Sequence, residues 1–397
     1  MSSTPDVLIV GSGAFGVAAA LELRQRGHRV SLLDGGPVPH PLAASTDIAK
    51  VVRVEYANDE EYTALAELAR ERWLRWNSEL FDKPLYHDIG LMKLTRGPML
   101  PGNYEYENYR SLTARGYHLE RLTQEDIARR FPAWNAELFV DGYINPRGGY
   151  VESGLVIEQL VKRAVAAGVV LHENQTVFGL ESVGRRATGV RTREGEVFHA
   201  GEVLVAAGAW TPVLLPELSS SMRPIGQPIF HVAPPNAEIF TPPLFYVFSA
   251  DSARTGWYGF PLHPRANVVK IAHHGAGWPV DPLHDARRVP ATYVERFRAF
   301  LADAFPPLAH AEIVYSRSCL YCDTPDEHFW IARHPDRPGL TVAAGDSGHG
   351  FKFVPVLGGL IADAVEGVPN RRLDRFRWRS FSQETVGAEA SRHRGAL

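Results

Sequence analysis

Three glycines near the start of the chain have the spacing of a phosphate-binding turn. They are Gly11, Gly13 and Gly16, in the pattern G-x-G-x-x-G. The first permits a tight turn, the second lets the backbone approach a pyrophosphate, and the third lets a helix pack closely on a sheet. Asp34 follows 23 residues after Gly11, where a carboxylate can accept hydrogen bonds from a ribose. The chemistry indicated is the binding of a dinucleotide.

The elements around these glycines are predicted to form one βαβ unit. Residues 7–10 are continuously apolar, as in a parallel strand buried on both faces, and residues 14–26 are predicted to be a helix closed by Gly27. A second apolar strand over residues 28–33 ends at Asp34. The strand, the helix and the acidic residue that flank it make this short glycine pattern specific for a dinucleotide-binding site. A glycine turn in an α/β protein without a dinucleotide is the alternative.

Isolated basic residues lie at other positions where a ligand can bind. Lys352 follows a buried strand at residues 340–345 and a glycine-rich turn, and open α/β sheets bind ligands at such strand ends. Lys50 and Arg53 are three residues apart in a segment, 45–53, that we predict to be helical, so they are expected to be neighbours. The alternatives are a lysine exposed to water and a solvated helix arginine.

A later segment, residues 267–274, is predicted to be a strand because it is rich in β-branched residues. Alternation along the strand puts Lys270, Ala272 and His274 on one face. Lys270 is either a functional ammonium group or a half-buried strand lysine. His274 is equally compatible with a ligand contact and with a core histidine.

The chain has two cysteines, Cys319 and Cys322, in a Cys-x-x-Cys pair. Two cysteines cannot build a disulfide framework. A zinc site would need two further ligands, and no histidine pair of the usual spacing lies nearby, so we expect no metal. A reactive thiol, a buried inert thiol and a redox pair are the remaining interpretations.

Composition excludes several classes of protein. The 397 residues are 45% hydrophobic and 22% charged, enough for two ordinary domains or one large one. A formal net charge of −3 gives no footprint of a nucleic-acid or membrane-surface binder. No 18-residue apolar run and no signal peptide are visible, so a cytoplasmic protein without membrane or nucleic-acid partners is expected. The oligomeric state is not fixed by the sequence, and a monomer is compatible with it.

The remaining pattern alternates between parallel α/β pieces and β-rich pieces. Helices are predicted over residues 59–81, 154–167, 291–305 and 354–365, and strands over 169–172, 203–210, 340–345 and several segments within 176–203 and 223–323. Residues 85–145 change character and read as an insertion. The polar residues after Phe381 are expected to form a loose tail.

Together, several segments resemble the D-amino-acid-oxidase-like flavoproteins, in the subgroup of monomeric sarcosine, N-methyltryptophan, pipecolate, saccharopine and fructosyl amino acid oxidases. The resemblance covers residues 5–367 and is carried by the glycine motif, the strand at 203–210, the segment 318–329 and the run 348–353. It implies a Rossmann-like FAD-binding domain interleaved with a β-rich substrate domain, an α/β plus α+β fold. The implied FAD domain is 1–84, 146–222 and 330–370, the substrate domain is 85–145 and 223–329, and 371–397 is a tail.

The resemblance also assigns roles to residues of this sequence. It implies that Cys319 is joined through sulfur to the 8α-methyl of FAD. Arg53 and Lys352 would hold a substrate carboxylate, with His274 and Tyr258 in the same cavity. Lys270 would assist O₂, because a fixed ammonium stabilises the anion formed by electron transfer to O₂. The residues implied to contact the cofactor are Gly11, Gly13, Ala14, Phe15, Gly16, Asp34, Lys50, Val177, Gly208, Trp210, Cys319, Gly348, His349, Gly350, Phe351 and Lys352.

The implied activity is the oxidation of a secondary amine of an amino or imino acid, with an imine and hydrogen peroxide as products and O₂ as acceptor. Lys50 and Asp346 depart from sarcosine oxidases, which carry an arginine and an apolar residue there, so the substrate is expected to differ from sarcosine. The alternatives are a fructosyl amino acid oxidase, a tailoring amine oxidase, a flavin dehydrogenase with another acceptor, and a non-catalytic flavin-binding protein.

Overall fold

The βαβ unit predicted around the glycines is present at the start of the chain. The computed structural model describes residues 4–382 and 384–395. Strand β1 is Val7–Val10, helix α1 is Ala14–Gln25 and strand β2 is Val30–Leu33, as the apolar runs predict. A Cβ added to Gly16 would lie 1.8 Å from the carbonyl oxygen of Gly11. The absence of a side chain at Gly16 therefore allows α1 to approach the turn that follows β1.

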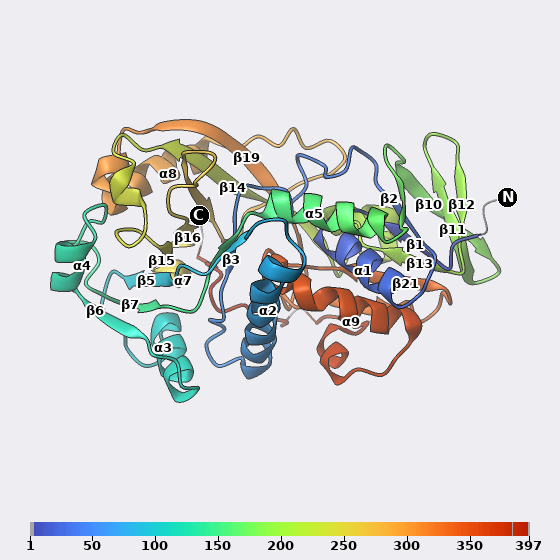
Figure 1. Ribbon diagram of the computed structural model, residues 1–397, viewed down its shortest axis with the longest axis horizontal. Helices are drawn as coiled ribbons and strands as arrows, with labels where there is room; N and C mark the ends of the chain where they lie inside the picture. The colour runs from blue at the N-terminus through green and yellow to red at the C-terminus, as the bar shows by residue number, and fades with distance from the viewer. Residues whose placement is uncertain (1–3, 383, 396–397) are drawn as a thin grey trace.

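A six-stranded sheet extends from this unit at one end of the molecule (Figure 1). Its order is β20-β21-β13-β1-β2-β9, parallel except that β20 pairs antiparallel with β21. The strands that complete it are β9 (Val170–His172), β13 (Glu202–Val205), β20 (Trp330–Arg333) and β21 (Leu340–Ala344). A small antiparallel sheet follows β9 and consists of β10 (Val177–Val183), β11 (Arg186–Thr192) and β12 (Val197–His199).

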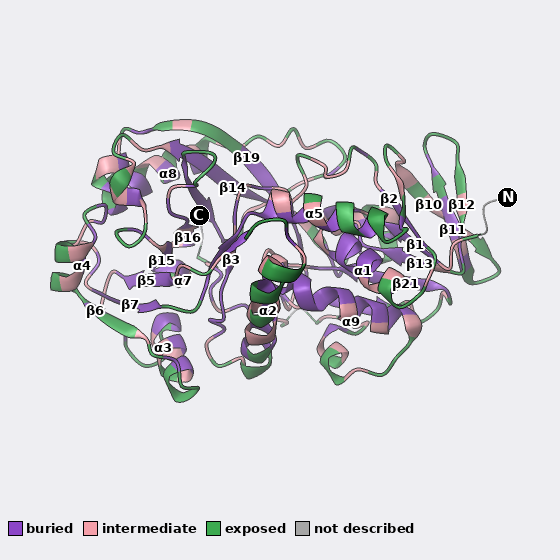
Figure 2. Cartoon of the chain, in the orientation of Figure 1, coloured by how far each residue is buried: buried purple, intermediate pink, exposed green. Residues whose placement is uncertain are grey.

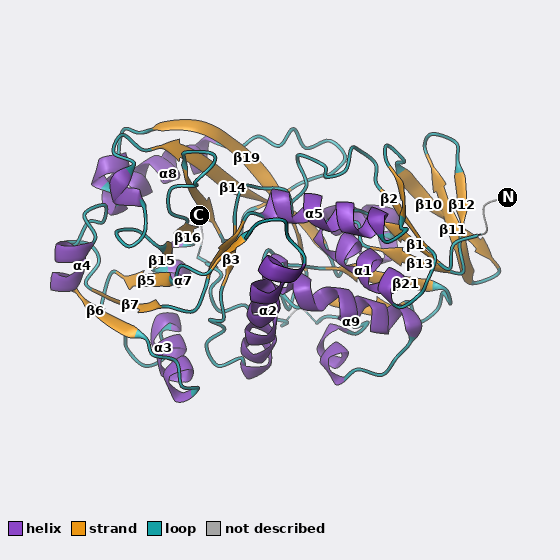
Figure 3. Cartoon of the chain, viewed as in Figure 1, coloured by secondary structure: helices purple, strands orange, loops and turns teal. Residues whose placement is uncertain are grey.

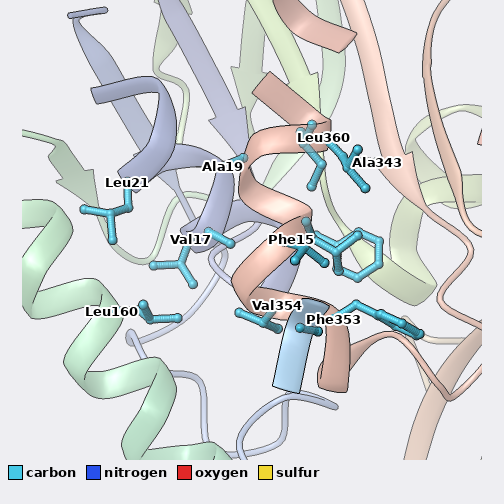
Figure 4. Packing of buried hydrophobic residues seen from close by; sticks show 14 of the residues in the cluster. Phe15, Val17, Ala19, Leu21, Leu160, Ala343, Phe353, Val354 and Leu360 are labelled. Atoms are coloured by element: carbon cyan, nitrogen blue, oxygen red, sulfur yellow. The ribbon is translucent and has the colours of Figure 1, made fainter. Parts of the chain in front are cut away.

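Helices α5 (Ser153–Ala166) and α9 (Val354–Glu366) pack beside α1, and α2 (Glu60–Glu79) packs against α9; together they form the core of this end. Figure 4 shows Val17 and Leu21 of α1 beside Leu160 of α5, and Phe15 near Val354 of α9. A Cβ added to Gly358 of α9 would lie 2.6 Å from the carbonyl oxygen of Ala18, so α1 and α9 approach closely through a glycine.

A nine-stranded sheet forms the other end. Its order is β18-β14-β17-β16-β15-β5-β7-β6, and β19 pairs with β14. Its strands are β5 (Leu91–Thr95), β6 (Glu120–Thr123), β7 (Asp141–Asn145), β14 (Arg223–Ala233), β15 (Val247–Ala250), β16 (Trp257–Gly259), β17 (Val269–His273), β18 (Trp278–Pro279) and β19 (Glu312–Asp323). The helices that accompany it are α3 (Tyr104–Ala114), α4 (Gln124–Arg130), α7 (Ser252–Thr255) and α8 (Ala291–Ala304).

The segment predicted to be an insertion, residues 85–145, contributes β5, β6 and β7 to this second sheet. The core beside the second sheet is rich in aromatic rings, and Phe230 of β14 stacks on Phe297 of α8 at 4.0 Å between ring centroids. Helix α8 thereby covers β14. Residues 85–145 and 223–329 both contribute strands to the second sheet, and the predicted domain boundaries stay a prediction.

The prediction of a helix over residues 45–53 is wrong. The structure has a strand there, β3 (Lys50–Val52), which pairs antiparallel with β8 (Gly149–Val151), and β8 also pairs with β4 (Tyr86–His87). The adjacent β-branched residues Val51 and Val52 favour an extended chain, and the backbone of β8 completes their hydrogen bonds. Lys50 and Arg53 are therefore not neighbours on a helix face.

The expectation of a loose tail after Phe381 is also wrong for the residues that the structure describes. Glu389, Ser391 and Arg392 are buried, with 4%, 6% and 6% of their surface exposed. A short 3₁₀ segment, η6 (Arg371–Phe376), leads into this tail. Figure 2 shows the C-terminal end of the chain at the end of the molecule that holds β15 and β16.

Short 3₁₀ and helical turns complete the fold, which Figure 3 displays by element type. They are η1 (Gly208–Trp210), α6 (Thr211–Leu214), η2 (Pro216–Leu218), η3 (Glu238–Phe240), η4 (Pro306–Leu308) and η5 (Phe351–Phe353). Across residues 4–382 and 384–395, none of the helices combines the length and the apolar character needed to span a bilayer.

Candidate functional site

A cavity of about 450 Å³ lies along the ends of the six-stranded sheet. This volume is typical of sites that hold small molecules and cofactors. One end is formed by Gly11, Gly13 and Asp34, and the other end reaches Tyr321 and Phe351. The cavity therefore starts at the βαβ unit and runs toward the second sheet.

The first turn of α1 offers free donors to this cavity. Gly13 lines the cavity and is the residue that precedes α1, and no side chain caps the helix there. The first backbone N–H groups of a helix have no partner within the helix, and the helix dipole favours an anion beside them. This end of the cavity therefore suits a phosphate group.

Asp34, at the end of β2, lines the same cavity. One of its oxygens accepts hydrogen bonds from the Ser12 backbone N at 2.8 Å and from the Ser12 hydroxyl at 2.6 Å. The other accepts only from the Gly36 backbone N, at 3.2 Å. Since a carboxylate has about four acceptor positions, Asp34 retains capacity for a hydroxyl group of a bound ribose.

The observed cradle fits a dinucleotide cofactor. Donors for a pyrophosphate, a carboxylate for a ribose and an apolar wall all line the same cavity. The predicted cofactor residues that line this cavity are Gly11, Gly13, Ala14, Phe15, Asp34, Lys50, Val177, Gly208, Trp210, Gly348 and Phe351. Gly16 lies beneath the turn that follows β1. Gly350 packs closely against Phe15, since a Cβ added to Gly350 would lie 2.9 Å from the Phe15 ring.

A second cavity of about 90 Å³ adjoins the first. Four residues line both cavities: Lys50, Tyr321, Gly348 and Phe351. Arg53, Lys352, His349, His274 and Tyr258, all predicted site residues, line the small cavity. A small molecule bound in it would therefore lie next to the inner end of a cofactor in the large cavity.

Arg53 is a buried cation of this small cavity, with 8% of its surface exposed. Its Nη1 donates to the Glu55 carbonyl oxygen, and its Nη2 donates to Glu389 Oε1 at 2.7 Å and to Ser391 Oγ at 3.0 Å. The guanidinium carbon lies 4.6 Å from the centre of the Tyr56 ring. Arg53 is thus held in place and already faces one carboxylate.

Lys352, in η5, is the second buried cation, with 5% exposed. Its Nζ donates to the Tyr56 hydroxyl at 3.0 Å and to the His349 carbonyl oxygen at 2.7 Å. Burial and the neighbouring charge of Arg53 hold the pKa of Lys352 well below its usual range. An anion in the small cavity would favour the charged form of this lysine.

Two further predicted residues form other parts of the cavity wall. His274 follows β17 and its Nε2 lies 2.8 Å from Glu389 Oε2. Tyr258 lies on β16, and burial raises the pKa of its hydroxyl. Both side chains are therefore available to shape a bound ligand, Tyr258 as a neutral hydroxyl group.

Lys270 is not among the described residues that line either cavity. Its Nζ forms an ion pair with Asp47 and donates to the Ala49 carbonyl oxygen, in the segment that precedes β3. The Nζ lies 4.8 Å from the centre of the Phe260 ring. Burial lowers the pKa of Lys270 to about 8. The role implied for this lysine stays a prediction.

The two cysteines have different surroundings, and both are free thiols. Cys319 is buried on β19, and its Sγ lies 4.0 Å from Lys50 Nζ. Cys322 belongs to the apolar core beneath the six-stranded sheet, where burial raises the pKa of its thiol. Because residues three apart on a strand face opposite ways, the pair is not arranged for a disulfide or a shared metal.

Two buried charged residues at the small cavity are missed by the sequence predictions: Lys93, which lines it, and Glu389, which contacts the lining residues Arg53 and His274. Lys93 of β5 lines this cavity with 1% of its surface exposed, and its Nζ donates to the Ser249 hydroxyl at 3.2 Å. A lysine between Met92 and Leu94 in an otherwise apolar strand is a signal that could have identified it. Glu389 lies in a polar segment, and no pattern there predicts its burial.

Comparison with known proteins adds a family to this geometry. The sequence profile of a family described as FAD dependent oxidoreductases matches residues 6–364. The chain is 30% identical to monomeric sarcosine oxidase of Streptomyces avermitilis, over 91% of this chain and 94% of that protein. It is 28% identical to L-saccharopine oxidase of Schizosaccharomyces pombe, over 94% of this chain and 93% of that protein.

A solved structure is also similar over most of the chain. The crystal structure of fructosyl amine:oxygen oxidoreductase (Amadoriase I) from Aspergillus fumigatus superposes with a TM-score of 0.81 and 25% identity. The match covers 96% of this chain and 90% of that one. The fold, including the cavity-bearing sheet, is therefore shared with enzymes of known structure.

Proposed function

The chain belongs to the family of FAD-dependent oxidoreductases, and from this premise we propose that it oxidises a secondary amine of an amino or imino acid, N-methyl or cyclic. The proposal depends on one observation. A small cavity with two buried cations, Arg53 and Lys352, joins a dinucleotide-sized cavity through shared residues. Relatives that oxidise sarcosine and saccharopine support the substrate class.

The two cations are proposed to hold the substrate carboxylate. A guanidinium group binds a carboxylate through two parallel hydrogen bonds, and a buried ammonium adds charge without fixing direction. Arg53 already bonds a carboxylate, that of Glu389, at 2.7 Å. This contact supports the assignment because it demonstrates room and geometry for such a group beside Arg53.

Bound FAD would accept the hydrogen that leaves the carbon next to the substrate nitrogen. The residues of the chain have the task of positioning. Arg53 and Lys352 fix the acidic end, while Tyr258 and His274 limit where the amine can lie. Lys50, at the junction of the cavities, adds a third positive charge that disfavours a protonated amine. The site therefore selects the neutral amine, which is the form that can be oxidised.

We propose further that Cys319 bonds through sulfur to the 8α-methyl of FAD. Lys50 Nζ lies 4.0 Å from Sγ and places a positive charge beside the sulfur that would attack the methyl group. Replacing the S–H and one C–H bond by the C–S bond would release two protons and two electrons, and O₂ would accept all of them as hydrogen peroxide. Acid precipitation tests this: the yellow colour should stay with the protein pellet of the wild type and remain in solution for Cys319→Ser.

Dioxygen is the proposed acceptor, and hydrogen peroxide the product, with Lys270 as the cation that stabilises reduced oxygen. The experiment for the whole proposal is anaerobic titration of the purified protein with sarcosine, L-pipecolate and L-saccharopine. We expect at least one to decolourise the flavin and, in air, to release one hydrogen peroxide per imine. Decolourisation without peroxide would identify a dehydrogenase, and no response to any amino or imino acid would refute the function.

The likeness to Amadoriase I supports a second candidate, oxidation of a fructosyl amino acid. The small cavity, about 90 Å³, argues for a smaller amine as long as the C-terminal tail stays in place. Fructosyl glycine added to the same titration separates the two candidates.

A further inference from the structure

The C-terminal tail brings a carboxylate against two residues of the predicted substrate site, Arg53 and His274. Glu389 lies near the end of the chain, yet only 2% of its side chain is exposed. The backbone N of Glu389 donates to Glu327 Oε2 at 2.8 Å, and the next residues reach the small cavity, which Ser391 lines. The tail is thus part of the wall of this cavity.

The carboxylate of Glu389 contacts residues proposed to bind the substrate. Oε1 accepts from Arg53 at 2.7 Å, and Oε2 lies 2.8 Å from His274 Nε2. The hydroxyl of Ser391 bonds to both oxygens, at 2.8 and 2.6 Å. The side chain therefore holds the position beside Arg53 that a substrate carboxylate requires.

The rest of the tail is attached through ion pairs and hydrogen bonds of arginine side chains. Arg392 pairs with Asp323, and Arg394 pairs with Glu327. Upstream, Arg379 forms two hydrogen bonds to Asp326, at 2.7 and 2.8 Å. Among the described residues the tail contributes no strand to either sheet, so it can leave while both sheets stay paired.

The charge balance decides what can replace Glu389. Withdrawing it leaves the buried guanidinium of Arg53 without a counter-charge, which is strongly unfavourable. An incoming carboxylate restores the same charge at the same place. An amine without a carboxylate supplies no counter-charge to Arg53. It must therefore bind while the tail is in place, or its binding free energy must include the cost of leaving Arg53 unpaired.

We propose that Glu389 is a specificity-determining residue of the amine site, a tethered carboxylate that occupies Arg53 until the carboxylate of a substrate displaces it. The inference rests on the proposed function and deepens it. Glu389 selects for amines that carry a carboxylate, and its departure enlarges the cavity for the rest of the substrate.

The test uses the holoenzyme and a simple carboxylate, propionate, with propionamide as its neutral counterpart. Binding is measured by isothermal titration calorimetry for the wild type, Glu389→Gln and the matched control Glu384→Gln. Glu384 is an exposed residue of the same tail. We expect Glu389→Gln to bind propionate about tenfold more tightly than the other two, because an amide competes weakly for Arg53. Propionamide should bind weakly to all three.

A second measurement needs no substitution. Arg392 is buried while the tail is in place, with 6% exposed, so trypsin cleaves after it slowly. Saturating propionate should accelerate loss of the C-terminal peptide several-fold, as followed by intact-protein mass spectrometry, and propionamide should not.

The outcomes separate this proposal from the proposed function. Equal propionate affinity in the wild type and Glu389→Gln, with unchanged cleavage, overturns the role of Glu389 and leaves the Arg53 and Lys352 clamp standing. Weaker binding by Glu389→Gln overturns it too, because Glu389 would then assist the ligand. No propionate binding to any variant overturns both.

Discussion

Arg53 and Glu389 form a buried ion pair, and its energetics can be measured directly. Replacing Arg53 by Met leaves the Glu389 carboxylate buried beside His274 without its main counter-charge. We expect Arg53→Met to lower the free energy of unfolding by about 3 kcal/mol. The double variant Arg53→Met with Glu389→Gln removes both charges, so it should recover at least half of that loss. Thermal unfolding of the four proteins gives the coupling, and a double variant no more stable than Arg53→Met would contradict the pair.

Lys93 is a residue whose burial should weaken the fold. Burial lowers the pKa of Lys93 to about 8, from 10.5. Below pH 8 the folded state holds a desolvated charge, and between pH 8 and 10.5 the unfolded chain binds the proton that the folded chain lacks. Stability due to this group therefore rises with pH over that window. We expect Lys93→Met to raise the free energy of unfolding at pH 7 by about 1 to 3 kcal/mol.

The control for Lys93 is Lys162→Met, because 70% of the Lys162 side chain is exposed and its ion pair with Asp82 spans 3.9 Å. This control should change stability very little. Thermal unfolding at pH 7 and at pH 10 should give a gain for Lys93→Met that shrinks at the higher pH. A loss of stability of Lys93→Met at pH 7 would show that Lys93 stabilises the fold and does not weaken it.

The role of Lys270 can be tested without leaving the carboxylate of Asp47 as an unpaired buried charge. Asp47 alone is first replaced by Asn, and Lys270→Met is then added to that background, since the two residues form a buried ion pair. We expect the added substitution to slow reoxidation of the flavin by O₂ about 100-fold, as for the loss of one preorganised electrostatic contact. Anaerobic reduction by the amine should change little. Stopped-flow absorbance measures both steps, and equal reoxidation rates would remove Lys270 from the reaction with O₂.

At the level of residues, the sequence predicted part of the small cavity. Arg53, Lys352 and Tyr258 do line it. The buried strand and glycine-rich turn before Lys352 located that lysine, whereas Arg53, from a segment predicted to be helical, and Tyr258 were assigned by the family resemblance. Lys93 and Glu389 were missed. Their positions depend on which strands and segments meet across the two sheets, and neither spacing nor composition carries that information.

Among the elements, the turn between β1 and α1 has the least tolerance for change. A side chain at Gly16 would collide with the carbonyl oxygen of Gly11, so Gly16→Ala must push the helix away from the turn. We expect a loss of about 2 to 4 kcal/mol in unfolding free energy and a lower FAD content per chain. Gly179→Ala is the control, because a Cβ there meets nothing within 4 Å. A Gly16→Ala protein with full FAD content would contradict the close approach.

The strand β3 illustrates why elements can be mispredicted while their function is preserved. Apolar residues at helical spacing favoured a helix over residues 45–53, but Lys50–Val52 pairs with β8, which lies about 100 residues later in the chain. Long-range pairing of this kind overrides a local pattern. The strand still delivers Lys50 and Arg53 to the small cavity, now from an extended segment.

For the whole molecule, the interleaving of two sheets was predictable and the path of the chain end was not. Apolar runs followed by turns located β1, β2, β13 and β21, which lie in one sheet. The family resemblance is confirmed by the match over residues 6–364. Residues 384–395 have few apolar side chains, so their burial depends on ion pairs formed with distant segments.

The position of the chain end bears on how the protein is handled in practice. His393 bonds to the backbone of His274 and Ala253, whereas Thr4, which precedes β1, is exposed. An affinity tag, reporter or surface linker inserted after Arg394 would pull on the peptide whose Ser391 lines the small cavity. The same cargo attached ahead of the first strand leaves the pocket untouched, so a biosensor built on this enzyme should be tethered by its amino end.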